Sequence, residues 1–223
     1  MNKKVIYTSV FGNYDDIVKP KLPDGWDWKC FSEENSLPIY EDNMRNAKRY
    51  KILPHRFLSE YEISIYMDGN FDIKSNLNHL LTNLENCNAA FFDHKQCKLD
   101  PRGCIYDEAK AIKWLYEINQ SPNKVPKDNL DIIENQILKY EEHGFPKNNG
   151  LICGGVIIRK HNESDCIKTM EDWWTEIKYH SKRDQLSFNY VAWKNDFKFN
   201  YLDGDIRDNQ YFNFMQHNKH KNK

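Results

Sequence analysis

The chain contains 223 residues, of which 39% are hydrophobic, 14% aromatic and 29% charged, and its formal net charge is −1. This length and aromatic content suffice for one α/β domain with a substantial core and exclude a disordered chain. The nearly balanced charge excludes a general nucleic-acid-binding protein, whose affinity comes from many basic residues that neutralise phosphates.

Three strands and one helix are predicted in the first part of the chain. Short runs rich in β-branched and aromatic residues predict strands over residues 5–10, 28–31 and 63–67. The segment 43–57 has helical spacing and many basic residues, and Pro54 is expected to break or restart this helix.

Helices predominate in the second part of the chain. Apolar spacing predicts helices over residues 77–86, 105–116, 130–140 and 167–177, and strands over 89–92 and 151–158. Because parallel neighbours in a sheet need a crossover connection, this alternation predicts an α/β fold with a mostly parallel central sheet flanked by helices.

The N-terminal sequence, the lengths of the apolar runs and the cysteines predict the compartment. The N-terminal residues become polar too quickly for a signal peptide, and no apolar run is long enough for a transmembrane segment. The six cysteines include no Cys-x-x-Cys pair, and several lie in apolar segments, where buried free thiols are common. We therefore expect a reducing, cytoplasmic setting.

The strongest local signal for a functional site is Asp68, which directly follows the third predicted strand. Open α/β sheets bind ligands at the carboxyl ends of their strands, where a carboxylate can hold a divalent cation that neutralises a diphosphate. The alternative is an Asp-Gly turn in which the carboxylate caps its own backbone. Spacing alone leaves both interpretations open.

The basic helix is a second candidate. Arg45, Lys48 and Arg49 lie at positions i, i+3 and i+4 and therefore share one helix face, which suits a diphosphate. The alternative is a solvated stripe, the usual environment of charged helical residues.

Two further candidates lie later in the chain. Gly154 and Gly155 interrupt a predicted strand, where missing side chains let a sugar or phosphate approach the backbone; a β-bulge is the alternative. Asp184 and Gln185 precede an apolar run and can hydrogen-bond sugar hydroxyls. An N-cap role for Asp184 is the alternative there.

A turn-rich segment between His94 and Glu108 has a high density of polar residues, including Arg102, and loops of this kind often carry binding residues. His94, Cys97 and Cys104 are ligand types found at zinc sites. However, Cys-x6-Cys is not the usual close pair and no fourth ligand is evident, so zinc is not predicted here.

Six segments, taken in order, resemble the glycosyltransferase-like family formerly called domain of unknown function 616. They are 5–15 (VIYTSVFGNYD), 47–56 (AKRYKILPHR), 66–70 (YMDGN), 102–109 (RGCIYDEA), 154–159 (GGVIIR) and 183–188 (RDQLSF). The resemblance spans most of the chain and extends more distantly to the glycogenin-like enzymes of the GT-A superfamily.

The resemblance implies a GT-A-type, Rossmann-like single domain over residues 1–216, followed by a basic C-terminal tail over 217–223. Its first strand would pack against the nucleoside, and the two candidate glycines would line the sugar side. The residues expected to bind the nucleotide-sugar are Thr8, Ser9, Val10, Tyr14, Arg45, Lys48, Arg49, Asp68, Gly154 and Gly155.

A metal site is also implied by the resemblance. Asp68 and Asn70 would occupy the Asp-x-Asp motif, and His217 would complete it. Because Asn70 replaces the second carboxylate, Mn²⁺ or Mg²⁺ would be held weakly. Catalysis would depend on Asp68, Asp184 and Gln185.

The implied reaction moves a sugar from a nucleotide-sugar donor, expected to be UDP-linked, to a glycan or another hydroxyl acceptor, as in polysaccharide biosynthesis. Inversion and retention at the anomeric carbon are both compatible with the pattern. Two alternatives use the same phosphate-facing groups. One is a non-catalytic nucleotide-sugar-binding module, and the other is a nucleotide-sugar hydrolase or nucleotidyltransferase.

Overall fold

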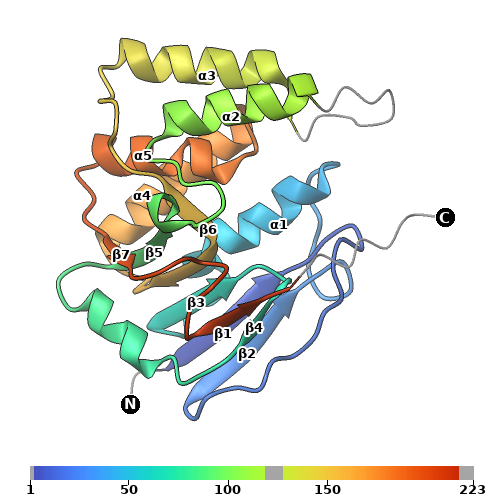
Figure 1. Ribbon diagram of the computed structural model, residues 1–223. Helices are drawn as coiled ribbons and strands as arrows, with labels where there is room; N and C mark the ends of the chain where they lie inside the picture. Colours follow the sequence, from blue (N-terminus) through green and yellow to red (C-terminus); the bar gives the residue numbers. More distant parts are fainter. Residues whose placement is uncertain (1–2, 119–127, 216–223) are drawn as a thin grey trace.

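Figure 1 shows the computed structural model, which describes residues 3–118 and 128–215. A six-stranded sheet lies at its centre in the order β2-β1-β3-β6-β5-β7. The strands are β1 (Lys4–Ser9), β2 (Trp26–Phe31), β3 (Ile63–Met67), β5 (Ala89–Asp93), β6 (Ile152–Arg159) and β7 (Asn200–Leu202).

The sheet is mixed but mostly parallel. β1 pairs in parallel with β2 and β3, and β5 pairs in parallel with β7, whereas β6 is antiparallel to both of its neighbours. The chain leaves the carboxyl end of β5 and returns beside it, pairing Asp93 with Ile152, so β6 starts at the edge where β5 ends. The predicted α/β fold class with a mostly parallel mixed sheet is confirmed.

Helices cover one face of this sheet (Figure 1). A first layer packs directly on the strands, and a second layer lies outside it. The first comprises α1 (Asn43–Ile52), α4 (Ser164–Tyr179) and α5 (Phe188–Lys194), and the second comprises α2 (Ile105–Ile118) and α3 (Leu130–Glu142).

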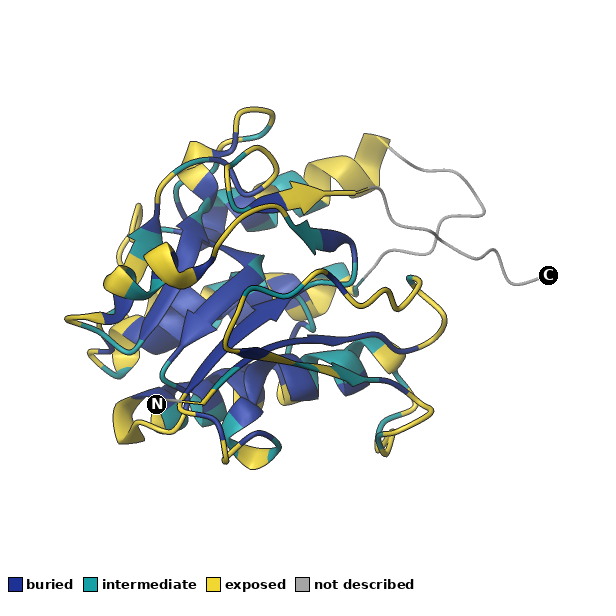
Figure 2. Cartoon of the chain, turned by 90° about the horizontal axis from the view of Figure 1, so that it is seen from below, coloured by how far each residue is buried: buried dark blue, intermediate teal, exposed yellow. Residues whose placement is uncertain are grey.

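The opposite face is covered by shorter elements. The 3₁₀ helix η2 (Asn78–Leu84) and the antiparallel ribbon of β4 (Phe71–Ile73) and β8 (Phe212–Phe214) pack there. Because neighbouring strand residues point to opposite sides, Tyr7 joins the helical core while Ile6 joins the other. Figure 2 shows the strands buried between these layers.

Most predicted elements are present, with two differences. The helix predicted over 43–57 ends at Ile52, and a 3₁₀ turn η1 (Pro54–Arg56) follows, as expected from the missing amide hydrogen of Pro54. The segment 77–86 is the 3₁₀ helix η2 rather than an α-helix. The predicted basic tail lies outside the described residues. Within the described helices, none has both the length and the apolar character needed to span a bilayer.

Candidate active site

Residues from distant parts of the sequence meet at one edge of the sheet. β1, β3 and β5 end at this edge and the antiparallel β6 begins there. Ser9, Asp68, His94 and Gly154 therefore lie along the same border, although up to 145 positions separate them in sequence. The carboxyl edge of an open α/β sheet is the usual place for a ligand site.

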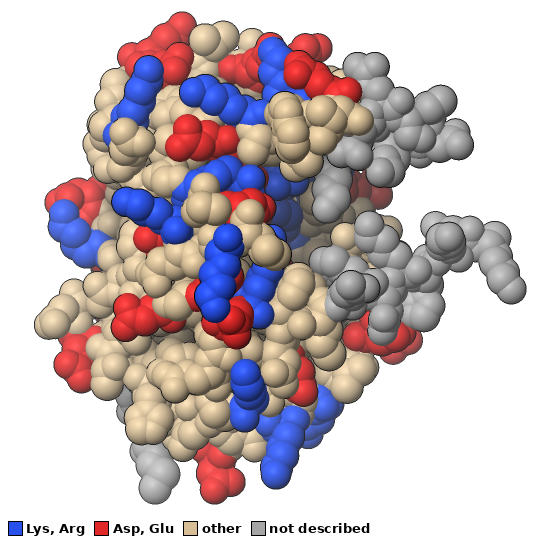
Figure 3. Space-filling model, in the orientation of Figure 1, with Lys and Arg blue, Asp and Glu red and all other residues tan. Residues whose placement is uncertain are grey.

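Two cavities open along this edge. The smaller, of about 460 Å³, lies beside the end of β1 and the start of α1, and the larger, of about 860 Å³, lies beside β5, β6 and α2. Both are lined by Asp68, Arg183 and Gln185, so they adjoin at these three residues. In Figure 3 a hollow with Lys and Arg side chains around it separates the α2–α3 layer from the sheet.

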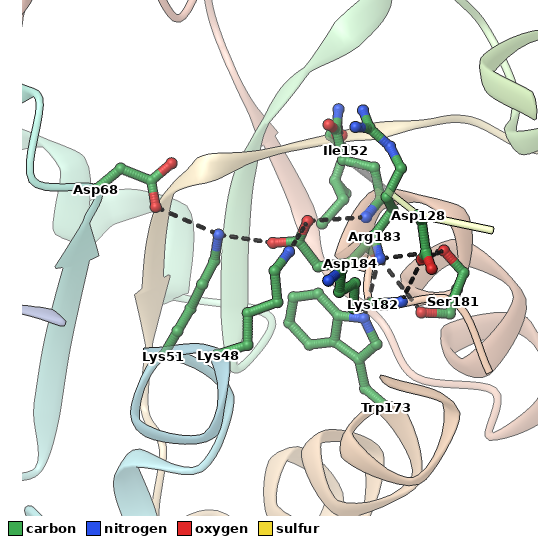
Figure 4. Close-up of polar contacts among 12 residues, drawn as sticks. Lys48, Lys51, Asp68, Asp128, Ile152, Trp173, Ser181, Lys182, Arg183 and Asp184 are labelled. Carbon is green, nitrogen blue, oxygen red and sulfur yellow. Dashed lines mark hydrogen bonds and ion pairs between the residues drawn. The ribbon is translucent and has the colours of Figure 1, made fainter. Parts of the chain in front are cut away.

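A buried group of charges lies where the cavities adjoin (Figure 4). Asp184 Oδ1 is 2.8 Å from Lys48 Nζ, and Asp184 Oδ2 is 2.6 Å from Lys51 Nζ. Lys51 also lies 3.5 Å from Asp68 Oδ1, which places its ammonium between two carboxylates. Trp173 of α4 holds this arrangement by donating its indole hydrogen to the backbone oxygen of Asp184 at 3.1 Å.

Charge pairing outweighs burial in setting the pKa values of Asp184 and Lys51, whereas burial outweighs pairing for Lys48. Burial opposes ionisation of Asp184, but the ammonium groups of Lys48 and Lys51 outweigh it and hold the pKa of this carboxyl far below its usual range. Burial lowers the pKa of Lys48, with Asp184 opposing this effect, whereas the carboxylates of Asp184 and Asp68 overcome burial and raise the pKa of Lys51. Pairing therefore favours the charged forms of Asp184 and Lys51.

Asp68 has its own supporting contacts. Its Oδ1 accepts a hydrogen bond of 2.8 Å from the Tyr66 hydroxyl, and its backbone amide donates to the Gly155 oxygen at 2.8 Å. Burial, and then the charge of Asp68, raise the pKa of Tyr66 well above its ordinary value, so this hydroxyl remains a donor. The carboxylate thus contacts the side chains of Tyr66 and Lys51, and its functional role stays a prediction.

The two glycines of β6 make room for these carboxylates. A Cβ atom on Gly154 would lie 2.9 Å from Asp184 Oδ2, and one on Gly155 would lie 3.3 Å from Asp68 Oδ2. The pairing of β5 with β6 also shifts register here, from Phe91 opposite Ile157 to Phe92 opposite Cys153. The register shift confirms the irregular strand, whereas the approach of a sugar or phosphate to these glycines stays a prediction.

The expectation that Arg45 and Arg49 face the site together with Lys48 is wrong. Arg45 forms an ion pair with Asp42 at 2.9 Å and donates to backbone oxygens at the end of α4. The guanidinium of Arg49 lies over the Phe57 ring, 4.8 Å from its centroid. Neither arginine lines either of the two cavities.

Lys51 is the residue that the sequence interpretation missed. It follows Lys48 by three positions, so the two lysines share a face of α1, and only their side chains reach Asp184 from that helix. The i, i+3 spacing was the available signal. The N-cap role for Asp184 is also wrong, because Arg183 occupies the N-cap position of the 3₁₀ helix η4 (Asp184–Leu186).

Only some of the residues expected to bind the nucleotide line a cavity. Ser9, Val10 and Tyr14 line the smaller cavity. Thr8 lines neither of the two cavities, because it points into the interior and is 3% exposed. Gln185 lines both cavities and donates to the backbone oxygen of Ile152 at 3.1 Å.

The proposed metal ligands are only partly described. Asn70 lines the larger cavity, and its amide nitrogen donates to the backbone oxygen of Met215 at 3.0 Å. Met215 in turn donates its backbone amide to Asn70 at 2.8 Å, so the chain close to its C-terminus runs beside the end of β3. His217 lies outside the described residues.

A second charged group lines the larger cavity. Glu108 of α2 is 1% exposed and lies 2.7 Å from Arg102 and 2.9 Å from Arg183. Arg183 also lines the smaller cavity, so this ion-pair group connects the polar segment that begins at His94 with the residues around Asp184. In the sequence, the high density of polar residues between His94 and Glu108 indicated that this segment carries binding residues.

The sequence matches a family model and a curated protein. The family model "TOD1/MUCI70, glycosyltransferase-like domain" matches residues 27–220 of the chain. The curated "Probable hexosyltransferase MUCI70" of Arabidopsis thaliana is 27% identical over 200 residues, which cover 87% of this chain. The chain spans about a third of that relative, because the match covers 32% of its length.

Two solved structures are also similar. One is a glycosyltransferase involved in glycosylation of the major capsid of PBCV-1, with a TM-score of 0.41, 8% identity and coverage of 91% of this chain and 81% of that one. The other is the bifunctional glycosyltransferase WbbM, with a TM-score of 0.46, 10% identity and coverage of 90% and 38%.

Proposed function

The chain belongs to the TOD1/MUCI70 glycosyltransferase-like domain family, and from this premise we propose that it transfers a hexosyl group from a UDP-linked donor to a hydroxyl group of a glycan acceptor. The hexosyl group follows the description of the Arabidopsis relative as a probable hexosyltransferase. UDP is the nucleotide that the family resemblance implies.

One observation carries this proposal: two cavities adjoin at Asp68, Arg183 and Gln185. Transfer needs a site for the donor nucleotide, a site for the acceptor and a point where the two substrates meet. The end of β1 lines the smaller cavity, which favours the nucleotide there. The larger cavity then receives the acceptor, and the transferred sugar lies where the two adjoin.

The charged group at that position suits the chemistry of transfer. The bond between the anomeric carbon and the phosphate oxygen breaks, and UDP leaves with its electron pair. A bond to the acceptor oxygen forms, and the proton of the acceptor hydroxyl is released to solvent. Lys48 and Lys51 stabilise negative charge that develops on the leaving diphosphate, since fixed charges in a buried site need no reorganisation. Asp184 holds both lysines in place, and Gln185 contacts the sugar from the adjoining position.

The charge balance supports a role for a metal ion. Among the residues described around the smaller cavity, Lys48, Lys51 and Arg183 are cationic, while four aspartates are anionic: Asp15, Asp42, Asp68 and Asp184. These residues therefore offer no excess positive charge to a diphosphate. Asp68 and Asn70 supply oxygen ligands that suit Mn²⁺ or Mg²⁺, and such an ion would neutralise the diphosphate. One carboxylate and one amide make a weak site without nucleotide.

The proposal is tested by assaying the full chain with UDP-hexoses, Mn²⁺ and a panel of glycan acceptors, measuring both UDP release and sugar incorporated into acceptor. Asp68→Asn should abolish incorporation. The control is Asp72→Asn, the same chemical change four residues later on β4, at a position that lines neither of these two cavities. This variant should retain full activity.

Three outcomes would overturn the proposal. Full incorporation by Asp68→Asn would show that the site lies elsewhere. Saturable UDP binding without turnover of any UDP-hexose would indicate a non-catalytic binding module. Sugar release at the full rate without acceptor would indicate a hydrolase, because water would then be the normal acceptor.

A further inference from the structure

A second cluster of reactive side chains lies at the same edge of the sheet, and the proposed transfer does not use it. His94 begins the 3₁₀ helix η3 (His94–Gln96) and Cys97 follows it, while Cys153 lies near the start of β6. The pairing of Phe92 with Cys153 brings these two segments together. All three side chains line the larger cavity.

The separation of these groups suits one metal ion. One potential ligand atom from each of the three residues lies within 4.8 Å of the other two. The Sγ atoms of Cys97 and Cys153 are 3.5 Å apart. Two thiolates on a tetrahedral zinc ion, with Zn–S distances of about 2.3 Å, lie roughly 3.8 Å apart. The sulfurs are therefore close to the required positions before an ion binds.

The environment of His94 provides a second, independent observation. This side chain is 4% exposed, and its Nε2 lies 3.1 Å from Arg102 Nη2. Because arginine only donates hydrogen bonds, Nε2 accepts and the ring proton resides on Nδ1. Within residues 3–118 and 128–215, Nδ1 is buried without a hydrogen-bond partner. A buried donor without an acceptor is unfavourable, and coordination at Nδ1 would remove it.

We propose that the chain binds one Zn²⁺ ion through His94 Nδ1, Cys97 Sγ and Cys153 Sγ, with the fourth coordination position open to the larger cavity. Thiolate and imidazole ligands favour zinc over Mn²⁺ and Mg²⁺, so this site is separate from the one proposed at Asp68. It also stands independently of the proposed transfer.

Zinc binding releases protons from the two cysteines and leaves the site without net charge. Both thiols release their protons, so two protons leave for each ion bound, and the two thiolates offset its charge. The ring proton of His94 moves to Nε2. Arg102 turns away from the imidazole and keeps Asp100 and Glu108, which it already contacts at 3.2 and 2.7 Å.

The test uses the full chain, reduced with a phosphine and stripped with a chelator. Zn²⁺ is titrated in competition with a chromophoric chelator, and Co²⁺ is titrated separately as a spectroscopic probe. We expect one ion per chain, with a sulfur-to-cobalt charge-transfer band and the strong visible bands of tetrahedral cobalt. Failure of the reduced wild-type chain to bind Zn²⁺, or a cobalt spectrum without the charge-transfer band, would overturn the proposal without any variant.

Variants assign the ligands. Cys97→Ser and Cys153→Ser should each weaken Zn²⁺ binding by more than about 100-fold, because even residues that only support a ligand change affinity by about 10–100-fold. The matched control is Cys104→Ser, another buried thiol, whose Sγ contacts Asp107 instead. Zinc affinity that is unchanged in Cys97→Ser and Cys153→Ser, with the fold intact by circular dichroism, would refute the assignment.

Discussion

Removing the negative charge of Asp184 tests whether the buried group of charges is what orders this site. Asp184→Asn keeps the size of the side chain but leaves the ammonium groups of Lys48 and Lys51, 2.8 and 2.6 Å away, without their shared carboxylate. Removing one partner of a buried ion pair costs about 3–5 kcal/mol. We expect a value near 3 kcal/mol, because Lys51 keeps Asp68 at 3.5 Å and Lys48 is 14% exposed.

The assay is urea unfolding at pH 7, in which the midpoint should fall while the slope stays constant. A loss of about 3 kcal/mol corresponds to a decrease in Tm of roughly 6–12 °C for a chain of this size. The control is Asp196→Asn, because Asp196 is 87% exposed and pairs with Lys198 only at the surface. Its free energy of unfolding should change by less than about 1 kcal/mol.

The pH dependence follows from the pKa directions. The pKa of Asp184 is lowered by folding. Its contribution to the free energy of unfolding is therefore present at neutral pH and is lost as the pH falls below the ordinary value of 3.8. In Asp184→Asn, Lys48 loses the carboxylate that opposes the effect of burial on its pKa, so its pKa in the folded state falls further below 10.5. The variant therefore gains stability as the pH rises towards 10.5. The difference from wild type should therefore be largest near neutral pH and smaller at both extremes.

A double variant separates stability from chemistry. Adding Lys48→Met to Asp184→Asn removes one unpaired charge and should recover part of the lost stability, but it should not recover sugar transfer. A destabilisation below about 1 kcal/mol at pH 7 in Asp184→Asn would refute the reasoning, since a buried pair could not then be what holds these residues.

Three further predictions concern the neighbours of this group. Arg45→Ala should lower the Tm and leave UDP affinity unchanged by calorimetry, because its guanidinium contacts the end of α4; weaker UDP binding would contradict this placement. Gly154→Ala should reduce sugar transfer, because the new Cβ would lie 2.9 Å from Asp184 Oδ2, whereas Gly103→Ala, with no atom within 4 Å, should behave as wild type; equal activity of the two variants would contradict the steric argument. Mn²⁺ should bind the chain more tightly when UDP is present, as isothermal titration can measure, and equal affinity with and without UDP would argue against a shared site.

Local features of this fold could be predicted from sequence alone. The buried strand over 63–67, the break at Pro54 and the amphipathic helices depend on neighbouring residues, and the structure has all of them. The alternation of strands and helices along the chain predicted the mostly parallel sheet, because parallel neighbours need a crossover connection. The matching family model confirmed the resemblance to a glycosyltransferase-like family, which rested on the order of short motifs.

The site depends on tertiary contacts that no local pattern encodes. Helical spacing placed Arg45, Lys48 and Arg49 on one face, but the packing of α1 against α4 decided that Lys48 and Lys51 point to Asp184. Cys97 and Cys104 are close in sequence and were therefore considered together as possible zinc ligands. In the structure, the pairing of β5 with β6 instead places Cys153 beside Cys97. Periodicity determines which residues share a face, but strand order and helix packing determine what that face meets, because these contacts join residues that lie far apart in the chain.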